Sequence, residues 1–342
     1  MSITLKEITK KENWEAFIAS HNYPVSFFQS WMWGDFEQSL GKKVTRLGIY
    51  QDSELIGVGQ AIVVTAKRGN FLHFRNGPVM PWDNLALVKE VFAALKAFAQ
   101  EIKLDFIRIS PLVPVDGPEE KALKKLHFVN SQIHDVDAEI TWVLDLSKSE
   151  QEILGEMRKQ TRYSVHKAQK EAVTVIKTQD PERIEDFWPI FQDTVARQKW
   201  HAYPKKYILQ EFNLFAKHDA ANLFLAEYQG KFIAAAIFIY YNCVAYYHHS
   251  GSLTAYRNIP ASYLIQWESI KEAKARSLKK YNFFGIARTD DPKHPWYGLS
   301  FFKKGFGGKE ERWLHAQDLP LKNRYWLTYF YEKLERKRRG YK

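Results

Sequence analysis

The sequence predicts an α+β protein with two mixed β-sheets, because three strands, a helix and a fourth strand occur twice in the same order. Each copy opens with two strand-like runs joined by a short polar turn, the pattern of a β-hairpin. The copies keep one spacing, since Glu54 matches Lys231 at a distance of 177 positions. Asp105 matches Asn282 at the same distance of 177 positions. A repeat of this length indicates a duplicated domain and not a solenoid.

Hydrophobic periodicity places the elements of each copy. Apolar residues recur at spacings of three and four between Val88 and Ile102, and again between Leu264 and Ala273, so each copy has one helix with an apolar face. Alternating patterns and turn residues give the strands. We expect strands at 44–50, 55–64, 70–74 and 105–109 with a helix at 88–102, and strands at 223–228, 231–240, 244–249 and 281–286 with a helix at 261–277.

The composition is that of an ordered protein with a basic surface. Its 342 residues are 45% hydrophobic and carry a net charge of +11, so they can fill the cores of two domains. Such a charge favours a polyanionic partner, namely tRNA, a nucleotide-linked precursor or an anionic membrane surface; a basic surface that binds nothing is the alternative. One cysteine, Cys243, excludes an intramolecular disulfide. No signal peptide and no apolar run of about eighteen residues occurs, so we expect a cytoplasmic protein.

An aromatic and glycine-rich segment, 294–308, follows the last expected strand and contains two adjacent lysines. Aromatic walls exclude water and glycines let a backbone approach a ligand closely, so we expect this segment to line a site. Lys303 is flanked by Phe302 and Phe306. An ammonium group held there could stabilise the oxyanion of an acyl transfer, because little water would screen its charge. One alternative is a surface lysine beside core phenylalanines. The other is Lys304 in the catalytic role, since its side chain points to the other face if the segment is extended.

Three segments together resemble the Fem family of tRNA-dependent aminoacyltransferases, which build the side-chain bridge of peptidoglycan precursors. They are Gln29–Gly34, Met157–Tyr163 and the run F-K-x-G-F-G-G at Phe302–Gly308, and the resemblance extends over residues 28–325. It implies two tandem domains of the GCN5-related acetyltransferase (GNAT) type with flanking helices and a C-terminal helix. It also implies transfer of an amino acid from aminoacyl-tRNA to an amine of the precursor's stem peptide, with the lysine of the run as the catalytic residue.

The expected domain boundaries follow from the repeat and from this resemblance. A short polar segment at 146–149 precedes a basic helix, so we place a first GNAT-like domain at 1–146 and a second at 147–316. In the Fem family a C-terminal helix returns to the first domain. Residues 317–342, with a helical pattern at 321–339, are therefore expected to complete it.

Neither copy keeps the coenzyme A loop of an acetyltransferase, R-x-x-G-x-G or R-x-x-G-x-A, in which free N–H groups at a helix N-terminus bind the pyrophosphate. The second copy reads R-N-I-P-A-S at 257–262, and its proline has no N–H to donate. The first copy reads P-W-D-N-L at 81–85, without glycine. We therefore expect no cofactor and a donor other than acyl-CoA, which independently favours aminoacyl-tRNA.

The resemblance also implies how the precursor's diphosphate and sugar are bound: by a basic residue just after Trp33-Gly34, an arginine in a second-domain loop and a tyrosine shortly after it. Tyr207 matches the tyrosine. Asp35 occupies the first place, where an anion would repel a diphosphate, and Ala202 or Tyr203 the second. A solvated charge is the alternative for each basic candidate. The substrate-binding candidates are Trp33, Asp35, Lys206, Tyr207, Tyr256, Arg257 and Phe302, with Lys205 as a further option.

The basic helix after residue 150 is a candidate for contact with tRNA. Arg158, Arg162 and His166 are spaced to lie on one face, where they could meet phosphates, and a solvated basic face is the alternative. Asp290 and Asp291 are candidates for the general base, although such a pair more often forms a turn.

No metal is expected, because His248-His249 and His294 lack the spacing or the neighbouring carboxylates of a metal site. No phosphate-binding G-x-x-x-x-G-K-[ST] or G-x-G-x-x-G loop occurs, so ATP and dinucleotides are not expected.

The predicted partners are aminoacyl-tRNA and a peptidoglycan precursor, either UDP-MurNAc-peptide or the lipid-linked form, with the inner membrane surface as a peripheral contact. We expect a monomer. Two other functions stay open: an N-acyltransferase acting on another amine, and a non-catalytic RNA-binding protein of the same fold whose affinity for tRNA would ignore the aminoacyl group.

Overall fold

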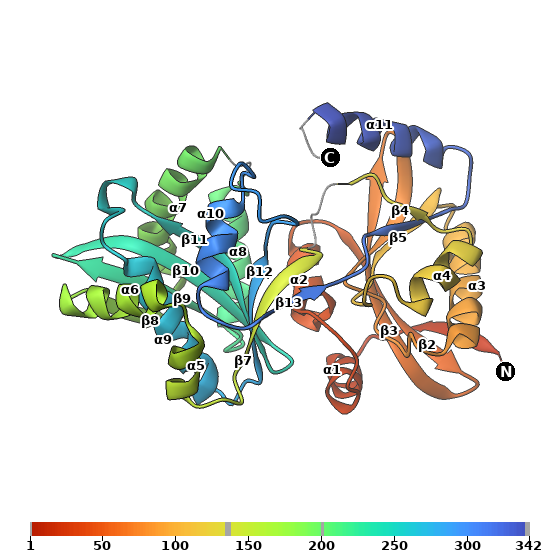
Figure 1. Cartoon of the computed structure of the whole chain (residues 1–342). Helices are drawn as coiled ribbons and strands as arrows, with labels where there is room; N and C mark the ends of the chain where they lie inside the picture. The colour runs from red at the N-terminus through yellow and green to blue at the C-terminus, as the bar shows by residue number, and fades with distance from the viewer. Residues whose placement is uncertain (1, 134–137, 200–201, 339–342) are drawn as a thin grey trace. The chain divides into compact units, whose positions relative to one another are not determined.

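The computed structural model describes residues 2–133, 138–199 and 202–338, which form two compact units (Figure 1). The first unit is Met1–Glu139 with Arg312–Lys342, and the second is Ile140–Glu311. Each unit contains one seven-stranded mixed sheet with helices packed against it. The predicted α+β class with two mixed sheets is confirmed.

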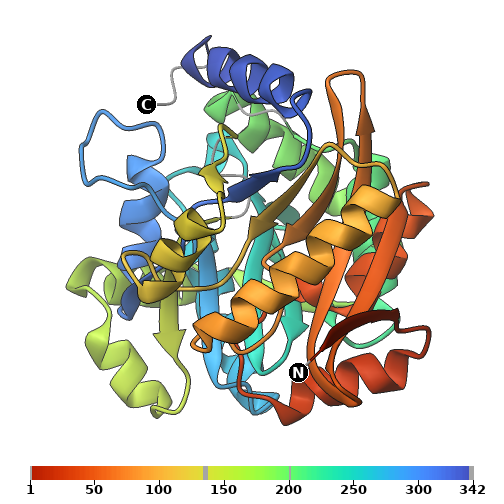
Figure 2. The same ribbon diagram turned by 90° about the vertical axis from the view of Figure 1, so that its right-hand side faces the viewer.

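The sheet of the first unit has the strand order β1-β2-β3-β4-β5-β14-β6. Strands β4 and β5 are parallel, and the other neighbours are antiparallel. Figure 2 shows the orange helix α3 running across this sheet. The elements are β1 (Ile3–Glu7), α1 (Lys11–Ser20), α2 (Trp31–Ser39), β2 (Lys43–Gln51), β3 (Glu54–Ala66), β4 (Gly69–Arg75), α3 (Leu85–Glu101), β5 (Phe106–Ser110), α4 (Pro118–Lys125), β6 (Val129–Asn130), β14 (Gln317–Pro320) and α11 (Tyr325–Arg338).

The sheet of the second unit has the order β13-β7-β12-β11-β10-β9-β8. Here β11 and β12 are parallel, as β4 and β5 are in the first unit. The elements are β7 (Ile140–Asp145), α5 (Glu150–Glu156), α6 (Lys159–Lys170), β8 (Thr174–Thr178), α7 (Ile184–Gln198), α8 (Lys205–Ala216), β9 (Ala221–Tyr228), β10 (Lys231–Tyr241), β11 (Val244–Ser252), α9 (Ala261–Ala275), β12 (Lys280–Gly285), α10 (Tyr297–Lys304) and β13 (Lys309–Arg312).

The internal duplication is present in the structure. The series β2-β3-β4-α3-β5 and β9-β10-β11-α9-β12 have the same order, with two antiparallel pairings followed by one parallel pairing. The helix that joins the two parallel strands fills the core in both units, since α3 contributes Val88, Val91 and Phe92 and α9 contributes Leu264 and Ile270.

The structure divides the chain at positions other than those expected from the sequence. Strand β7 pairs with β12 of the second sheet, with Leu144 opposite Tyr281, so the second unit begins at Ile140 and not after residue 146. Strand β14 inserts between β5 and β6 of the first sheet. The first four residues of the segment 317–342 therefore form a strand, and the C-terminal helix begins at Tyr325.

A buried ionic cluster joins β5, β14 and α11. Arg108 is 3% exposed, and its guanidinium donates to both carboxylate oxygens of Asp318, at 2.7 and 2.8 Å, and of Glu332, at 3.0 and 2.7 Å. The hydroxyl of Tyr325 donates to Asp318 at 3.2 Å. Because these acids surround the guanidinium, the pKa of Arg108 lies well above its usual range although burial alone would lower it.

Across residues 2–133, 138–199 and 202–338, no helix is both long enough and apolar enough to cross a lipid bilayer.

Candidate active site

Lys303 lies on α10 and is buried in the second unit, with 5% of its surface exposed. Its Nζ donates to the carbonyl oxygen of Gly285 at 2.6 Å and lies 5.8 Å from the centre of the Tyr247 ring. Among the described residues, no carboxylate forms an ion pair with it. Because burial disfavours the charged form, the pKa of the Lys303 ammonium falls to about 7.

Lys304 differs from Lys303 in its exposure and in its partner. The segment is a helix and not the extended run considered from the sequence, so adjacent side chains point about 100° apart. Lys304 Nζ pairs with Asp290 at 2.6 Å and lies 5.6 Å from the centre of the Trp142 ring. Its partner carboxylate is largely exposed to solvent. The buried lysine of the pair is therefore Lys303.

The carbonyl group that Lys303 contacts is available because β12 leaves the regular ladder. Strands β11 and β12 pair from Val244 to Tyr246. The register of β12 against β7 shifts between Asn282 and Gly285. Phe284 has a φ of 64°, in the left-handed region that few non-glycine residues adopt. The two parallel strands thus separate, and Lys303 lies where they do.

A cavity of about 310 Å³ lies beside this opening in the second unit. Phe302 and Tyr247 line it, and Tyr263 at the start of α9 packs edge-on against Phe302 with ring centres 4.8 Å apart. Lys303 is not among the lining residues, but its neighbour Phe302 and its contact Tyr247 are. Two residues next to the buried lysine therefore form part of the cavity wall. Its other lining residues are Thr194, Arg197, Gln198, Ala235, Ala236, Ser250, Gly251, Ser252, Ser262, Ile265, Gln266, Pro295, Gly298 and Leu299.

The glycines after Lys304 contact the chain itself, whereas we expected them to face a ligand. A Cβ on Gly308 would lie 2.2 Å from the carbonyl oxygen of Val143, and one on Gly305 would lie 2.4 Å from Thr161 Oγ1. Gly308 also has a φ of 91°, which side chains disfavour. These glycines allow the end of α10 to pack closely on β7 and α6, so they fix the position of Lys303.

A buried carboxylate bridges two adjacent histidines on the face of the second sheet that α8 covers. A β-bulge between Ile237 and Phe238 leaves His248 as the extra residue of β11, so His248 and His249 point to the same face. Glu211 of α8 is 2% exposed, and each of its carboxylate oxygens lies 2.8 Å from the Nε2 of one histidine. The three ligand atoms lie within 4.8 Å of one another. The expectation from the sequence that this histidine pair lacks a neighbouring carboxylate is therefore wrong.

Glu211 supplies a prediction about acid stability. Burial raises the pKa of its carboxyl, but the two nearby imidazole groups outweigh burial and hold the pKa well below its usual range. The folded state therefore binds fewer protons than the unfolded state, and this stability is present above the unfolded pKa of about 4.3 and lost as the pH falls below it. Glu211→Gln should lower the free energy of unfolding at pH 7 by about 3 kcal/mol, the scale of breaking a buried charge pair.

Urea denaturation of wild-type and variant proteins at a series of pH values measures this effect. Glu185→Gln is the matched control, because the Glu185 carboxylate is largely exposed and pairs with Lys205 at the surface. The control should stay within about 0.5 kcal/mol of wild type. Equal effects of the two substitutions would contradict the structural role of Glu211.

Tyr207 lies next to this cluster, one helical turn before Glu211 on α8. Its ring stacks on Tyr203 with centres 4.1 Å apart, and Tyr203 packs edge-on against His249 at 6.5 Å. Phe284, which precedes the carbonyl group bound by Lys303, lies 5.8 Å from the ring of His248. A chain of ring contacts through Tyr203, His249 and His248 thus connects Tyr207 with Phe284 at the opening in the sheet.

The remaining candidates of the second unit lie elsewhere. Lys206 is exposed on α8, whereas Lys205 pairs with Glu185. Tyr256 packs edge-on against Tyr228 at 6.3 Å, and Arg257 is exposed after it.

Trp33 and Asp35 belong to the first unit. Trp33 is buried among Phe27, Phe28 and Phe36. Asp35 does not present an uncompensated charge, because its Oδ1 accepts from Arg46 at 2.6 Å. Arg46 of β2 was not a candidate from the sequence. Only the packing of β2 beside α2 brings its guanidinium to Asp35.

Arg158 and Arg162 both donate to backbone carbonyl groups of the second unit. Arg158 donates to Phe301 and lies 3.8 Å from the centre of its ring, which ties α6 to α10. Arg162 donates to Leu154, Gly155 and Met157 at the end of α5. The exposed residues of α6 are Lys159, Gln160, Tyr163, His166, Gln169 and Lys170.

The two aspartates proposed as general bases have structural roles. Asp290 pairs with Lys304, and Asp291 Oδ1 accepts from the backbone N–H of Lys293 at 2.9 Å within the turn before α10.

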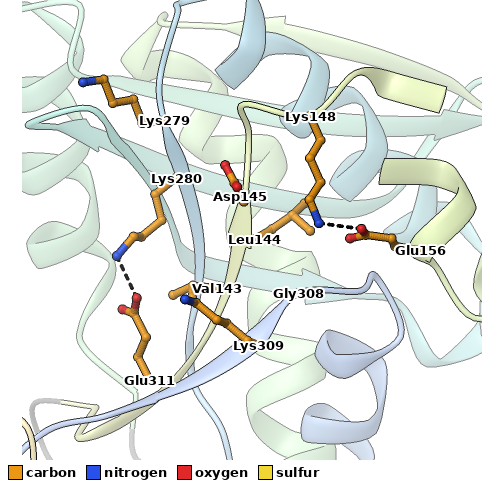
Figure 3. A pocket seen from close by; sticks show the side chains of 10 residues that line it. All are labelled: Val143, Leu144, Asp145, Lys148, Glu156, Lys279, Lys280, Gly308, Lys309 and Glu311. Atoms are coloured by element: carbon orange, nitrogen blue, oxygen red, sulfur yellow. Dashed lines mark hydrogen bonds and ion pairs between the residues drawn. The ribbon is translucent and has the colours of Figure 1, made fainter. Parts of the chain in front are cut away.

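A second hollow of about 400 Å³ lies near β7 and β13 (Figure 3). Four lysines and three acids line it, and Lys148 pairs with Glu156 while Lys280 pairs with Glu311. Most of the charge is thus balanced within the hollow, which lacks an aromatic wall. It is larger than the cavity beside Phe302, but neither Phe302, the neighbour of Lys303, nor Tyr247, its contact, lines it. We therefore place the site at the cavity.

Sequence comparison places the chain in a known family. The profile of the FemAB family matches it at residues 8–136, 125–231 and 219–333. The chain belongs to the FemAB family. A lipid II:glycine glycyltransferase of Staphylococcus haemolyticus (strain JCSC1435) is 20% identical over 374 aligned positions, which cover 88% of each chain.

Solved structures share the fold. The crystal structure of FemX is 18% identical and superposes with a TM-score of 0.84 over 96% of this chain and 100% of its own. A tandem GNAT protein from the clavulanic acid biosynthesis pathway is 9% identical, with a TM-score of 0.57 over 94% of this chain and 99% of its own. The resemblance to the Fem family and the GNAT-like fold of both units are confirmed.

In this FemAB chain the loop before α9 uses its own N–H groups. Ile259 donates to the carbonyl of Tyr256 at 2.9 Å, Ala261 to that of Ile259 at 2.8 Å, and Tyr263 to that of Pro260 at 3.0 Å. A pyrophosphate at a helix N-terminus needs several such groups to be free. At α3, the other helix of this kind, the Asn84 side chain accepts from Leu87.

Proposed function

We propose that this protein transfers an amino acid from aminoacyl-tRNA to an amine of a peptidoglycan precursor's stem peptide and so forms part of an interpeptide bridge. Membership of the FemAB family and relatives named lipid II:glycine glycyltransferase support the reaction class. The observation that carries the proposal is the buried Lys303 beside an aromatic-walled cavity, with no carboxylate partner among the described residues. The relatives' names favour a lipid-linked acceptor.

The chemistry follows from the environment of Lys303. Attack of a neutral amine on an aminoacyl ester gives a tetrahedral intermediate with a negatively charged oxygen. As it breaks down, the C–O bond to tRNA breaks, the amine nitrogen loses a proton and the leaving oxygen gains one, so an amide and the tRNA hydroxyl are formed. An ammonium group in a water-poor site stabilises that oxygen strongly, because little solvent screens the interaction. In this role Lys303 would exchange its bond to the Gly285 carbonyl for one to the oxyanion. Phe302 and Tyr247 would exclude water from the ester.

We assign the acceptor's diphosphate and sugar to the surface around Tyr207, with Lys206 of the same helix as a further contact. Tyr207 is the best supported of these, because its ring is held by Tyr203 next to the opening in the second sheet.

The loop before α9 yields a prediction about the donor. Because the N–H groups of Ile259, Ala261 and Tyr263 are already bonded and Pro260 has none, isothermal titration with acetyl-CoA should show no specific binding. Aminoacyl-tRNA should bind in the same buffer. Micromolar binding of acetyl-CoA would overturn this prediction and favour an N-acyltransferase that uses acyl-CoA.

Comparison of charged and uncharged tRNA separates catalysis from RNA binding alone. We expect aminoacyl-tRNA to bind more tightly than the deacylated form, because the cavity beside Phe302 would hold the aminoacyl group. We expect the exposed face of α6 to contact tRNA phosphates. Arg158 and Arg162 would join these contacts if they release their bonds to backbone carbonyl groups. Equal affinity for both forms, without transfer, would support the non-catalytic alternative.

A further inference from the structure

Helix α11, the dark blue C-terminal helix of Figure 1, has an unusual outward face. Its inward face follows a helical spacing of three and four, with Tyr325 and Thr328 buried on the first sheet and Glu332 bound to Arg108. The opposite face carries Leu327, Phe330 and Leu334, which are 62%, 62% and 64% exposed. A surface helix normally places polar residues there. This outward face is called the apolar stripe below.

Aromatic side chains flank the apolar stripe. Trp326 and Tyr331 are 40% and 41% exposed, and the guanidinium of Arg68 lies 3.5 Å from the centre of the Tyr331 ring. Arg68 is at the tip of the β3–β4 hairpin, whose backbone also accepts bonds from Arg324 and Thr328. The hairpin tip and α11 thus form one surface. Of the large apolar side chains exposed in the described part of the chain, most of the highest exposures are on this helix.

The charges around the apolar stripe are mostly positive. Of the two acids on α11, Glu332 is neutralised by Arg108 and Glu335 lies 3.4 Å from Arg338. Lysines and arginines occur on α11, on the segment before it and at the hairpin tip, and two of them, Lys322 and Arg324, lie 3.6 and 3.8 Å from Asp105. The full set of these basic residues is Lys67, Arg68, Lys322, Arg324, Lys333, Arg336, Lys337 and Arg338.

We propose that the apolar stripe of α11 and the surrounding basic residues dock this protein on an anionic lipid bilayer. Leucine and phenylalanine would enter the boundary between headgroups and acyl chains, tryptophan and tyrosine would lie at headgroup level, and the cations would attract acidic headgroups. With 14 residues and a charged end, α11 would lie in the plane of the surface.

An anionic bilayer explains the apolar stripe and its basic surroundings better than a second copy of the chain or an RNA strand. A second copy of the chain would bring two positively charged rims together across a twofold interface, and like charges would oppose such a dimer. An RNA strand would be attracted by the same cations and could stack on Trp326, Phe330 and Tyr331, but it would gain nothing from the exposed leucines. Leu327 and Leu334 offer no ring, and they are the most exposed apolar residues of the stripe together with Phe330.

Vesicle sedimentation tests the proposal with the full chain and without any precursor, so the result does not depend on the proposed reaction. Wild type should sediment with vesicles of equal parts phosphatidylglycerol and phosphatidylcholine and remain in solution with phosphatidylcholine alone. Leu327→Ser/Phe330→Ser keeps the charge and should weaken binding by roughly tenfold or more, because two apolar side chains no longer enter the lipid. Val115→Ser/Ile176→Ser, at exposed apolar positions elsewhere, should bind like wild type.

A spectroscopic readout covers the case in which the double variant does not fold. The difference in fluorescence between wild type and Trp326→Phe reports on Trp326 and should shift to shorter wavelength when anionic vesicles are added. Unchanged difference fluorescence, or equal sedimentation of wild type and the Leu327→Ser/Phe330→Ser variant, would overturn the proposal. It would also be overturned by a wild-type dimer that this variant dissociates, or by loss of tRNA binding in the variant with no vesicle binding by wild type.

Discussion

Replacement of Lys303 with methionine should lower the rate of aminoacyl transfer by on the order of a hundredfold or more, the usual effect of removing an oxyanion-stabilising group. The variant should still fold, because methionine suits a buried position of similar length. Single-turnover transfer from labelled aminoacyl-tRNA measures the effect. Lys304→Met is the matched control and should be close to wild type, since Lys304 pairs with the exposed Asp290. Near-normal turnover by Lys303→Met, or equal losses in both variants, would contradict the role of Lys303.

The same substitution should make the protein more stable. Burial lowers the folded pKa of Lys303 to about 7 from an unfolded value near 10.5, so the unfolded state binds more protons between these values. The buried ammonium therefore destabilises the folded state at and below pH 7, and this cost disappears as the pH rises towards 10.5. Lys303→Met should raise the free energy of unfolding at pH 7 by roughly 2 kcal/mol, after the lost bond to Gly285 is counted. A less stable variant would show that the lysine is structural.

The second large effect concerns Arg108. Arg108→Met should lower the free energy of unfolding by about 3 to 5 kcal/mol, because the carboxylates of Asp318 and Glu332 would lose the cation that compensates them. Urea denaturation gives the total loss, and hydrogen exchange should show it first in β14 and α11. Arg183→Met is the control, since its pair with Asp186 lies at the surface. A loss no larger than that of the control would contradict the structural role of the cluster.

Restoration of charge balance offers a check on this cause. Arg108→Met/Asp318→Asn/Glu332→Gln leaves no buried charge in the cluster, so it should recover part of the lost stability. If the triple variant is less stable than Arg108→Met alone, the shape of the guanidinium and not its charge holds α11 in place.

The repeated unit could be predicted from the sequence because its signals are local. The hairpin turns, the alternation of the strands and the apolar spacing of 88–102 depend on neighbouring residues, and the structure has β2, β3, β4, α3 and β5 close to the expected ranges. The exchange of strands could not be predicted in this way. Nothing in the sequence of Ile140–Asp145 or Gln317–Pro320 states which sheet it joins, because that depends on pairing with distant residues.

The candidate site could be predicted from the sequence only in part, because several of its contacts join residues that are distant in the sequence. The sequence singled out the lysine and its aromatic neighbours but did not predict helix α10. The contact between Glu211 and the two histidines depends on a β-bulge, and the pairing of Asp35 with Arg46 depends on packing between α2 and β2. Such contacts between distant residues leave no spacing that a reader of the sequence could find.

Transfer of label tests the central claim most directly. The protein is incubated with a pool of radiolabelled aminoacyl-tRNAs and either UDP-MurNAc-peptide or its lipid-linked form, and the labelled precursor is separated and hydrolysed. The account predicts that one amino acid becomes joined by an amide bond to the stem peptide, that the label is absent when Lys303→Met replaces wild type, and that acetyl-CoA labels nothing. Label that stays on tRNA with both precursors while acetyl-CoA acetylates an amine would contradict it.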